Sequence, residues 1–302
     1  MNLRNRLSLY YYCVKRVFAD EKQLSKGQKN NYELLQLSHR LEKGLLIRNP
    51  KPLWGWEKAY KIVELLKDNN DVFSSETAKA VLSAFLKVKE KSFHDKDRIK
   101  CKEFFDRTNF SIENNNKGGT ICVEKVNFIE TEIKAIEKLF YSRHSCRDFS
   151  DKTVSNDDIS KAIKMALRCP SACNRQPFKV YVISPSKLED IIGRNLQYKC
   201  DKLLIVTGDV RAFTAGELLD WLISPSLFAA YLTLSLHTLG IGSCIIRKDL
   251  VKDNMYNKTI KDITCMTDSE RIVLEMYIGY YNDKFIAPVS NRFDVSDVVR
   301  YI

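Results

Sequence analysis

The segments SRHSCRDF, at residues 142–149, and PSACNRQPF, at residues 170–178, decide the fold of this chain and hold most of its recognisable chemistry. In the first segment, Arg143 and Arg147 lie on either side of Ser145. Guanidinium groups present planar forks of donors that match phosphate oxygens, so an anion site is one interpretation. Basic residues near a helix end are also common on solvated faces, so this segment alone leaves both interpretations open.

The residues between the two segments predict an amphipathic helix. Ser155 fits the N-cap position with Asp158 three residues later, and Val154 and Ile159 fit the hydrophobic staple around this cap. Apolar residues recur at helical spacing up to Leu167, and Pro170 ends the pattern. A β-branched and aromatic strand is expected at 179–184. The second segment would thus be a polar loop held between a helix and a core strand, where binding sites are common.

Two prolines, Pro170 and Pro177, restrict the backbone of this loop. The side chains between them offer hydrogen-bond donors and acceptors that could read the polar edge of a ring. They are Ser171, Asn174, Arg175 and Gln176.

Taken in order, the two segments and the intervening helix resemble the opening of the nitroreductase family of FMN-dependent oxidoreductases. The resemblance covers residues from about 127 to 302. It implies an α+β fold with a central mixed, mostly antiparallel sheet flanked by helices, here preceded by a helical N-terminal region. It also implies FMN as the cofactor, NAD(P)H as a transient electron donor and a small-molecule electron acceptor. Relatives are typically homodimers with flavin sites at the subunit interface.

The same resemblance implies which residues hold FMN. Arginine and serine side chains would bind the phosphate, the loop after Pro170 would hold the ring, and a glycine-containing loop would approach its reactive edge. A second basic residue that the family often has two positions before Arg292 is Ser290 here, which removes one phosphate contact. No side-chain acid or base is strictly needed, so no catalytic residue is nominated. The implied contacts are Arg143, Ser145, Arg147, Pro170, Ser171, Asn174, Gln176, Asn195, Gly242, Ser243 and Arg292.

Two downstream features have alternative interpretations. Residues 226–239 are apolar on nearly every helical face, which predicts full burial in a core or in an oligomer interface; the resemblance favours the interface. The glycines at 240 and 242 suit a loop that approaches a ligand closely. A C-cap turn before the next strand explains them equally well.

Residues 1–120 are expected to form a basic helical extension, and residues 121–302 the FMN-binding domain. The extension holds 24 Lys and Arg against 15 Asp and Glu, so most of the net charge of +11 lies there. The asparagines and glycines of 111–120 predict a linker between the two parts. Lysines spread over solvated helix faces explain the charge better than nucleic-acid binding, and contact of the basic N-terminus with a membrane surface is a further alternative.

Nine cysteines without a C-x-x-C pair favour a reducing compartment, and we expect a cytoplasmic protein. The main alternative to an enzyme is a nitroreductase-like fold without redox activity that acts as a binding module through its extension. A dedicated biosynthetic oxidation, a dehalogenation or a flavin-fragmenting reaction on the same fold is also compatible with the sequence.

Overall fold

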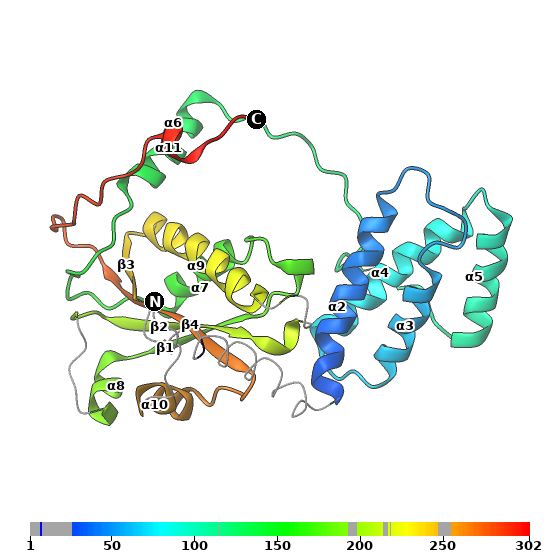
Figure 1. The fold of residues 1–302 in the computed structure, drawn as a ribbon, viewed down its shortest axis with the longest axis horizontal. Helices are drawn as coiled ribbons and strands as arrows, with labels where there is room; N and C mark the ends of the chain where they lie inside the picture. The colour runs from blue at the N-terminus through cyan, green and yellow to red at the C-terminus, as the bar shows by residue number, and fades with distance from the viewer. Residues whose placement is uncertain are drawn as a thin grey trace.

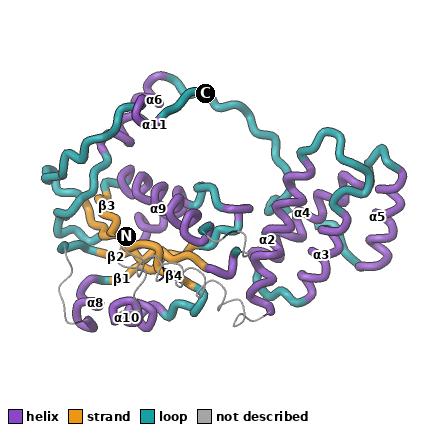
Figure 2. Tube along the Cα trace, viewed as in Figure 1, coloured by secondary structure: helices purple, strands orange, loops and turns teal. Residues whose placement is uncertain are grey.

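The structure is a computed structural model that describes residues 7, 26–113, 115–192, 198–213, 217, 219–246 and 255–302. From Lys26 on, the described residues form first a group of helices and then a sheet with helices on both faces (Figures 1 and 2). The helices are α2 (Lys26–Leu45), α3 (Trp56–Lys67), α4 (Val72–Glu90), α5 (Asp95–Thr108), α6 (Glu130–Ser142), α7 (Asn156–Ala166), α8 (Pro185–Ile192), α9 (Asp220–Thr238), α10 (Met255–Thr264) and α11 (Val295–Val298), with 3-10 turns η1 (Ala172–Asn174) and η2 (Val210–Ala212). The strands are β1 (Phe178–Ile183), β2 (Lys202–Asp209), β3 (Ile241–Ile246) and β4 (Glu270–Tyr280).

Helices α2 to α5 pack around an apolar core of their own. Its fully buried members include Leu34, Leu41 and Phe85. Asp97 is buried among them and accepts hydrogen bonds from Trp56 Nε1 at 2.9 Å and Lys89 Nζ at 3.0 Å. This buried carboxylate is therefore matched by a cation and a donor, as stability requires.

The four strands form one antiparallel sheet in the order β1-β2-β4-β3. Helices α7 and α9 cover one face, with Phe228 and Leu232 packed on sheet residues such as Val206. Helices α8 and α10 lie on the other face (Figure 1), where Ile260 joins a second cluster. The three-layer α+β arrangement agrees with the fold class expected from the sequence.

Local predictions for the central helix and the strand after it are confirmed, while two helix boundaries differ. Ser155 caps α7 by accepting a hydrogen bond from the Asp158 backbone at 3.0 Å, and strand β1 follows the second segment as expected. Leu167, expected on the buried face, is 44% exposed because it lies beyond the last helical turn. In the sequence, Asn127 with Glu130 three residues later predicts the N-cap of α6, but Ile129 holds that position and its N–H donates to the Glu132 carboxylate at 2.9 Å.

Two stretches project from the body of the sheet (Figure 1), and many of their apolar side chains are exposed. Helix α6 has no buried residue, and the C-terminal stretch after β4 continues with Ile286, Val289 and Phe293 more than 80% exposed. Exposed apolar surface of this extent is unusual for a chain on its own. Among the described residues, none of the helices combines the length and apolar composition needed to cross a membrane.

Candidate functional site

The loop of the second segment is held in a strained backbone conformation. Cys173, Asn174 and Gln176 all have positive φ values, of 50°, 51° and 49°. Residues other than glycine adopt this left-handed region at a cost of about 1 kcal/mol or more each, and such strain clusters at functional sites. Ser171 supports the loop, since its hydroxyl accepts from the Gln176 backbone at 3.2 Å and its carbonyl accepts from the Asn174 backbone at 3.0 Å.

Arg175 anchors this loop from below and is not free to read a ligand. Its guanidinium is 2% exposed and donates to both carboxylate oxygens of Glu217, at 3.0 and 2.6 Å. It also donates to the carbonyls of Ala172 and Ala212 and stacks 4.5 Å from the ring of Phe213. The idea that Arg175 joins its neighbours in reading a ring edge is therefore wrong. Its burial leaves Pro170 and Asn174 exposed and Ser171 and Gln176 partly exposed at the loop surface.

The first segment runs along the outer edge of β3. Ser145 forms a parallel bridge with Ser243, and the Cys146 backbone donates to the Ser243 carbonyl at 3.0 Å. Arg143 follows the end of α6, and the Arg147 guanidinium lies 5.7 Å from the ring of Tyr198. Among the described residues, no carboxylate pairs with Arg143, Arg147 or Arg292, whereas Arg175 and Arg211 each have one. None of the three arginines expected to face FMN is therefore held in an ion pair within the described residues, although Arg147 and Arg292 donate to backbone carbonyls.

Beside Arg143 lies a row of hydrogen-bonding groups that the sequence did not reveal. His237, at the end of α9, has its Nε2 2.8 Å from Ser142 Oγ and its Nδ1 3.0 Å from the Tyr281 hydroxyl. Burial, and then the positive charges of Arg143 and His144, lower the pKa of His237. Because Tyr281 is 44 residues further along the chain, no local sequence signal links the two.

Of the two glycines after α9, Gly242 belongs to strand β3 and not to a loop, which corrects one expectation, while Gly240 lies in the turn before it. Gly240 has φ +70° and ends the helix, and Gly242 and Ser243 are buried in β3. A Cβ on Gly242 would lie 2.8 Å from the Cys146 Cβ and 2.9 Å from the Tyr281 ring. Close packing against the first segment accounts for this glycine, and the C-cap turn accounts for the other.

Two residues expected to contact FMN remain, Asn195 and Arg292. Arg292 is exposed on the C-terminal stretch, where its guanidinium donates to the backbone carbonyls of Ser290 and Asn291. Asn195 lies outside the described residues.

The two segments occupy different edges of the sheet within one chain. Phe178, the last residue of the second segment, pairs with Gly208, and Gly208 pairs with Arg271 at the start of β4. Ser243, beside the first segment, pairs with Ile278 near the other end of β4. From the usual strand spacing and rise, the segments are about 19 Å apart across the sheet, which is four strand spacings, and about 20 Å apart along it. A single subunit therefore does not bring both segments around one ligand.

A cluster that sequence reasoning missed joins α2 to the end of β2. The Tyr32 hydroxyl donates to Asp209 Oδ2 at 3.2 Å, and Arg211 donates from Nε to both oxygens of the same carboxylate at 2.9 Å. Burial, and then the negative charge of Asp209, raise the pKa of Tyr32 above its ordinary range. The polar residues directly after the buried run of β2 were the available signal, but their partner in α2 is 177 residues away.

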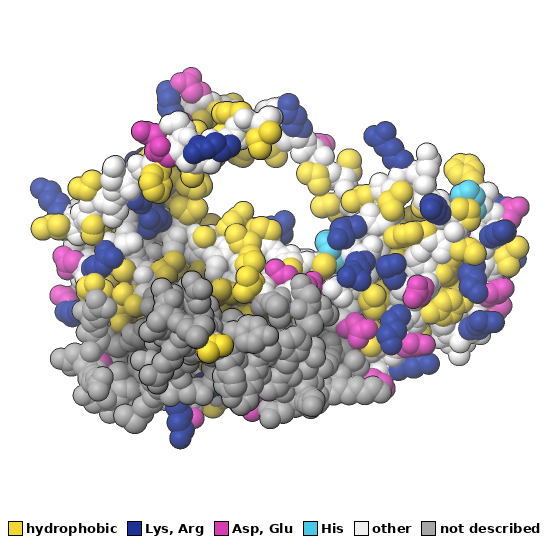
Figure 3. Space-filling view, in the orientation of Figure 1, with side chains coloured by type: hydrophobic (Ala, Val, Ile, Leu, Met, Phe, Trp, Pro, Cys, Tyr) yellow, Lys and Arg dark blue, Asp and Glu magenta, His cyan; other side chains and the backbone are white. Residues whose placement is uncertain are grey.

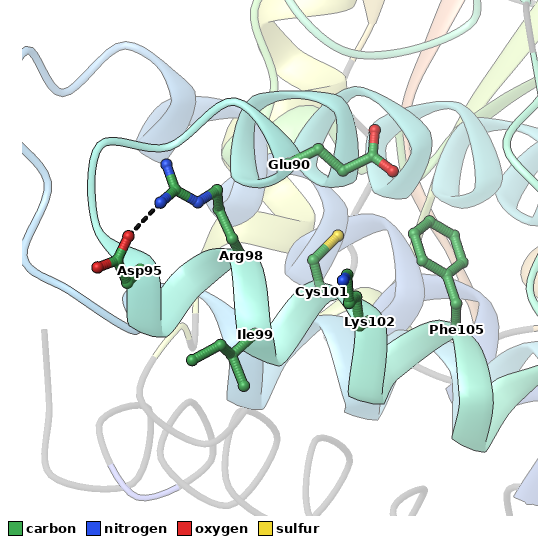
Figure 4. A pocket seen from close by; sticks show the side chains of 7 residues that line it. All are labelled: Glu90, Asp95, Arg98, Ile99, Cys101, Lys102 and Phe105. Atoms are coloured by element: carbon green, nitrogen blue, oxygen red, sulfur yellow. Dashed lines mark hydrogen bonds and ion pairs between the residues drawn. The ribbon is translucent and has the colours of Figure 1, made fainter.

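A separate cavity of about 550 Å³ lies between α4 and α5 (Figure 4). Figure 4 shows Arg98 paired with Asp95 at one end, and the Cys101 thiol between Glu90 and Phe105. Burial, and then the charge of Glu90, raise the pKa of Cys101 to about 11, so its thiol stays protonated and weakly nucleophilic. None of the residues expected to bind FMN lines this cavity.

Comparison with known proteins identifies the family. The family model described as "Nitroreductase family" matches residues 141–215, which contain both segments. A protein of Archaeoglobus fulgidus named "Putative NADH dehydrogenase/NAD(P)H nitroreductase" is 44% identical over 169 residues, which are 54% of this chain and 95% of that protein. This chain belongs to the nitroreductase family. The nitroreductase match begins at residue 141, so helices α2 to α5 lie outside the matched region.

Solved structures that are similar to this chain include proteins from two bacteria. An FMN-dependent nitroreductase from Clostridium difficile R20291 has 22% identity and a TM-score of 0.43, covering 55% of this chain and 98% of that one. A nitroreductase-like family protein from Bacillus cereus has 18% identity and a TM-score of 0.47, covering 59% and 99%.

Proposed function

We propose that this protein is an FMN-dependent oxidoreductase that transfers hydride from NAD(P)H to a small acceptor, either nitro-aromatic, quinone-like or specific to a biosynthetic reaction. Family membership supports the reaction class, and the name of the Archaeoglobus relative suggests the nicotinamide donor. One observation carries the proposal. The arginines that resemble the family's phosphate ligands have no carboxylate partner among the described residues, in contrast to the structurally paired Arg175 and Arg211.

In this proposal, Arg143, Ser145 and Arg292 bind the FMN phosphate, because unpaired guanidinium groups and a hydroxyl suit its oxygens. Arg147 would hold the ring at its N1 and O2 edge, where its positive charge would favour flavin reduction. When bound, FMN supplies two-electron redox chemistry between NAD(P)H and the acceptor.

The strained second loop holds the ring edge. Pro170 and Ser171 fix its entry, and the side-chain amides of Asn174 and Gln176 provide donors and acceptors. The buried ion pair below keeps this loop in its high-energy conformation before any ligand arrives. Such preorganisation reduces the ordering cost of binding.

We further propose a homodimer whose flavin sites combine the first segment of one subunit with the second segment of its partner. The separation of the two segments across one sheet supports this arrangement. So does α9, which buries Phe228 and Leu232 but leaves Ile223, Leu227 and Tyr231 at 48%, 39% and 43% exposure. Figure 3 shows apolar side chains gathered where α9 lies in Figure 1, and a second copy would cover them.

The domain division and the cellular location expected from the sequence are also part of this proposal. Residues 1–120 would form a separate helical domain, consistent with the distinct apolar core of α2 to α5. Cytoplasmic localisation rests on the cysteine pattern of the sequence.

The test is the visible absorbance spectrum of the purified protein, before and after adding FMN and then NADH or NADPH. We expect a bound-flavin spectrum that bleaches with one of the two nicotinamides. The paired substitutions Arg143→Ala and Arg292→Ala should abolish FMN retention, whereas Arg168→Ala, an exposed arginine at the end of α7, should retain it. A wild-type protein that does not bind FMN would overturn the proposal. Unchanged flavin content in the double variant would show that the phosphate site lies elsewhere.

A further inference from the structure

A second cavity, of about 510 Å³, lies where the N-terminal helices meet the nitroreductase domain. Asn31 and Tyr32 of α2 and Phe73 of α4 line one side, while Gln176 and Phe178 line the other. Its size falls in the range of small-molecule sites, which occur preferentially at domain interfaces. The family match does not include α2 or α4, so this cavity is formed partly by the extension.

The charged groups in the cavity wall are nearly all neutralised by the protein itself. Arg211 is paired with Asp209, Arg175 with Glu217, and Lys179 with Glu270 at 2.6 Å. Each cation therefore already has a carboxylate, and little positive potential remains to attract an anionic ligand.

The one acidic group in the wall without a cationic partner among the described residues is Asp71. It caps α4 by accepting a hydrogen bond from the Ser74 backbone at 2.8 Å. This negative charge at the cavity disfavours anions further.

Two polar side chains in the wall keep unused hydrogen-bonding capacity. Within the described part of the chain, nothing hydrogen-bonds to the side-chain amide of Asn31 or of Gln176, and each amide can both donate and accept. Around them are aromatic walls: Phe178, already stacked at 4.4 Å on Phe228, together with Tyr32 and Phe73. Aromatic walls favour flat ligands, and the two amides favour a ligand edge that carries both a carbonyl and an N–H.

We infer that this cavity is a binding site for a small, uncharged, planar ring compound with adjacent carbonyl and N–H groups, a cyclic amide or imide. Asn31 of the extension and Gln176 of the second segment read its edge. The site is distinct from the flavin phosphate site and gives the N-terminal helices a role in ligand recognition. Because Gln176 also belongs to the loop proposed to hold the flavin ring, the two sites share one wall.

The test uses uracil as a neutral cyclic imide and orotate as the same ring with a carboxylate. Binding is measured by saturation-transfer NMR and calorimetry, with and without saturating FMN, so that uracil in the flavin ring site is recognised by its complete displacement by FMN. We expect uracil to bind in both conditions, only a few-fold more weakly when FMN engages the shared Gln176, and orotate to bind at least tenfold more weakly than uracil. Equal or tighter binding of orotate would show that the basic side chains read the ligand, and would overturn the inference.

Variants locate the site. Asn31→Trp fills the cavity and should abolish uracil binding, whereas Glu33→Trp, which places the same side chain on the exposed face of α2, should leave it unchanged. Phe73→Ala removes an aromatic wall at a 54% exposed position where folding is not at risk, and should weaken binding several-fold. Absence of uracil binding in the wild type, or binding that survives both Asn31→Trp and Phe73→Ala, would refute the inference.

Discussion

Arg175→Ala should destabilise the domain strongly, because this arginine holds the second loop from within the protein. The guanidinium is 2% exposed and makes two hydrogen bonds to Glu217 and two to backbone carbonyls. Removing one partner of a buried pair typically costs about 3–5 kcal/mol, since the other charge is left unpaired. The Glu217 side chain is 25% exposed, so water relieves part of this penalty, and we expect a loss of about 2–4 kcal/mol.

Urea unfolding followed by circular dichroism measures this loss, with Arg168→Ala as the matched exposed control. A loss of this size corresponds to a midpoint shift of roughly 1 M urea, against almost none for the control. A double-mutant cycle with Glu217→Ala isolates the pair. The double variant should lose less than the sum of the single variants, because it leaves no unpaired charge. Additive losses, or an Arg175→Ala variant as stable as Arg168→Ala, would refute the reasoning.

Three further predictions concern the packing, titration and thiols of the domain. Gly242→Ala should cost about 1–3 kcal/mol and reduce FMN retention, because its Cβ would meet the Cys146 Cβ at 2.8 Å; unfolding curves and flavin content check this. Hydrogen bonds from Tyr280, and then from Ser155 and Lys161, lower the pKa of Asp158 to about 2 from 3.8, so its stabilisation is complete above pH 3.8 and lost as pH falls toward 2. The urea midpoint of Asp158→Asn should therefore fall less steeply than that of the wild type over this interval. Iodoacetamide should label the exposed Cys265 in the native protein. It should label Cys146 only after unfolding, because this thiol is buried and burial is the main cause that raises its pKa. Mass spectrometry detects both labels.

Local signals in the sequence were sufficient for the central helix and the strands. The Ser155 cap and the alternation of β-branched residues act over a few positions, so α7 and β1 could be predicted before the structure. The same applies to the polar loop between them. The prediction for Arg175 was wrong because residue type does not reveal whether a side chain points to solvent or into the protein. Arg175 points inward to Glu217, 42 residues away.

Features that depend on distant partners could not be predicted. The role of Gly242 follows from its contact with Cys146, almost a hundred residues earlier, and the cavity beside Gln176 depends on Asn31 of the extension. The apolar face of α9 was ambiguous for a related reason. A hydrophobic helix predicts burial, but only the structure reveals that one face, including Leu227, is left uncovered in a single chain.

The central claim is that one flavin site needs two subunits, and subunit complementation tests it most directly. Arg143→Glu disables the first segment and Ser171→Trp blocks the second, so neither homodimer should retain FMN. Coexpression of the two variants with different tags, followed by tandem purification, isolates the heterodimer. If the segments combine across subunits, one of its two sites is intact and it should carry half the flavin of the wild-type dimer. If both segments of a site come from one subunit, each site keeps a defect, and a heterodimer without flavin would contradict the account.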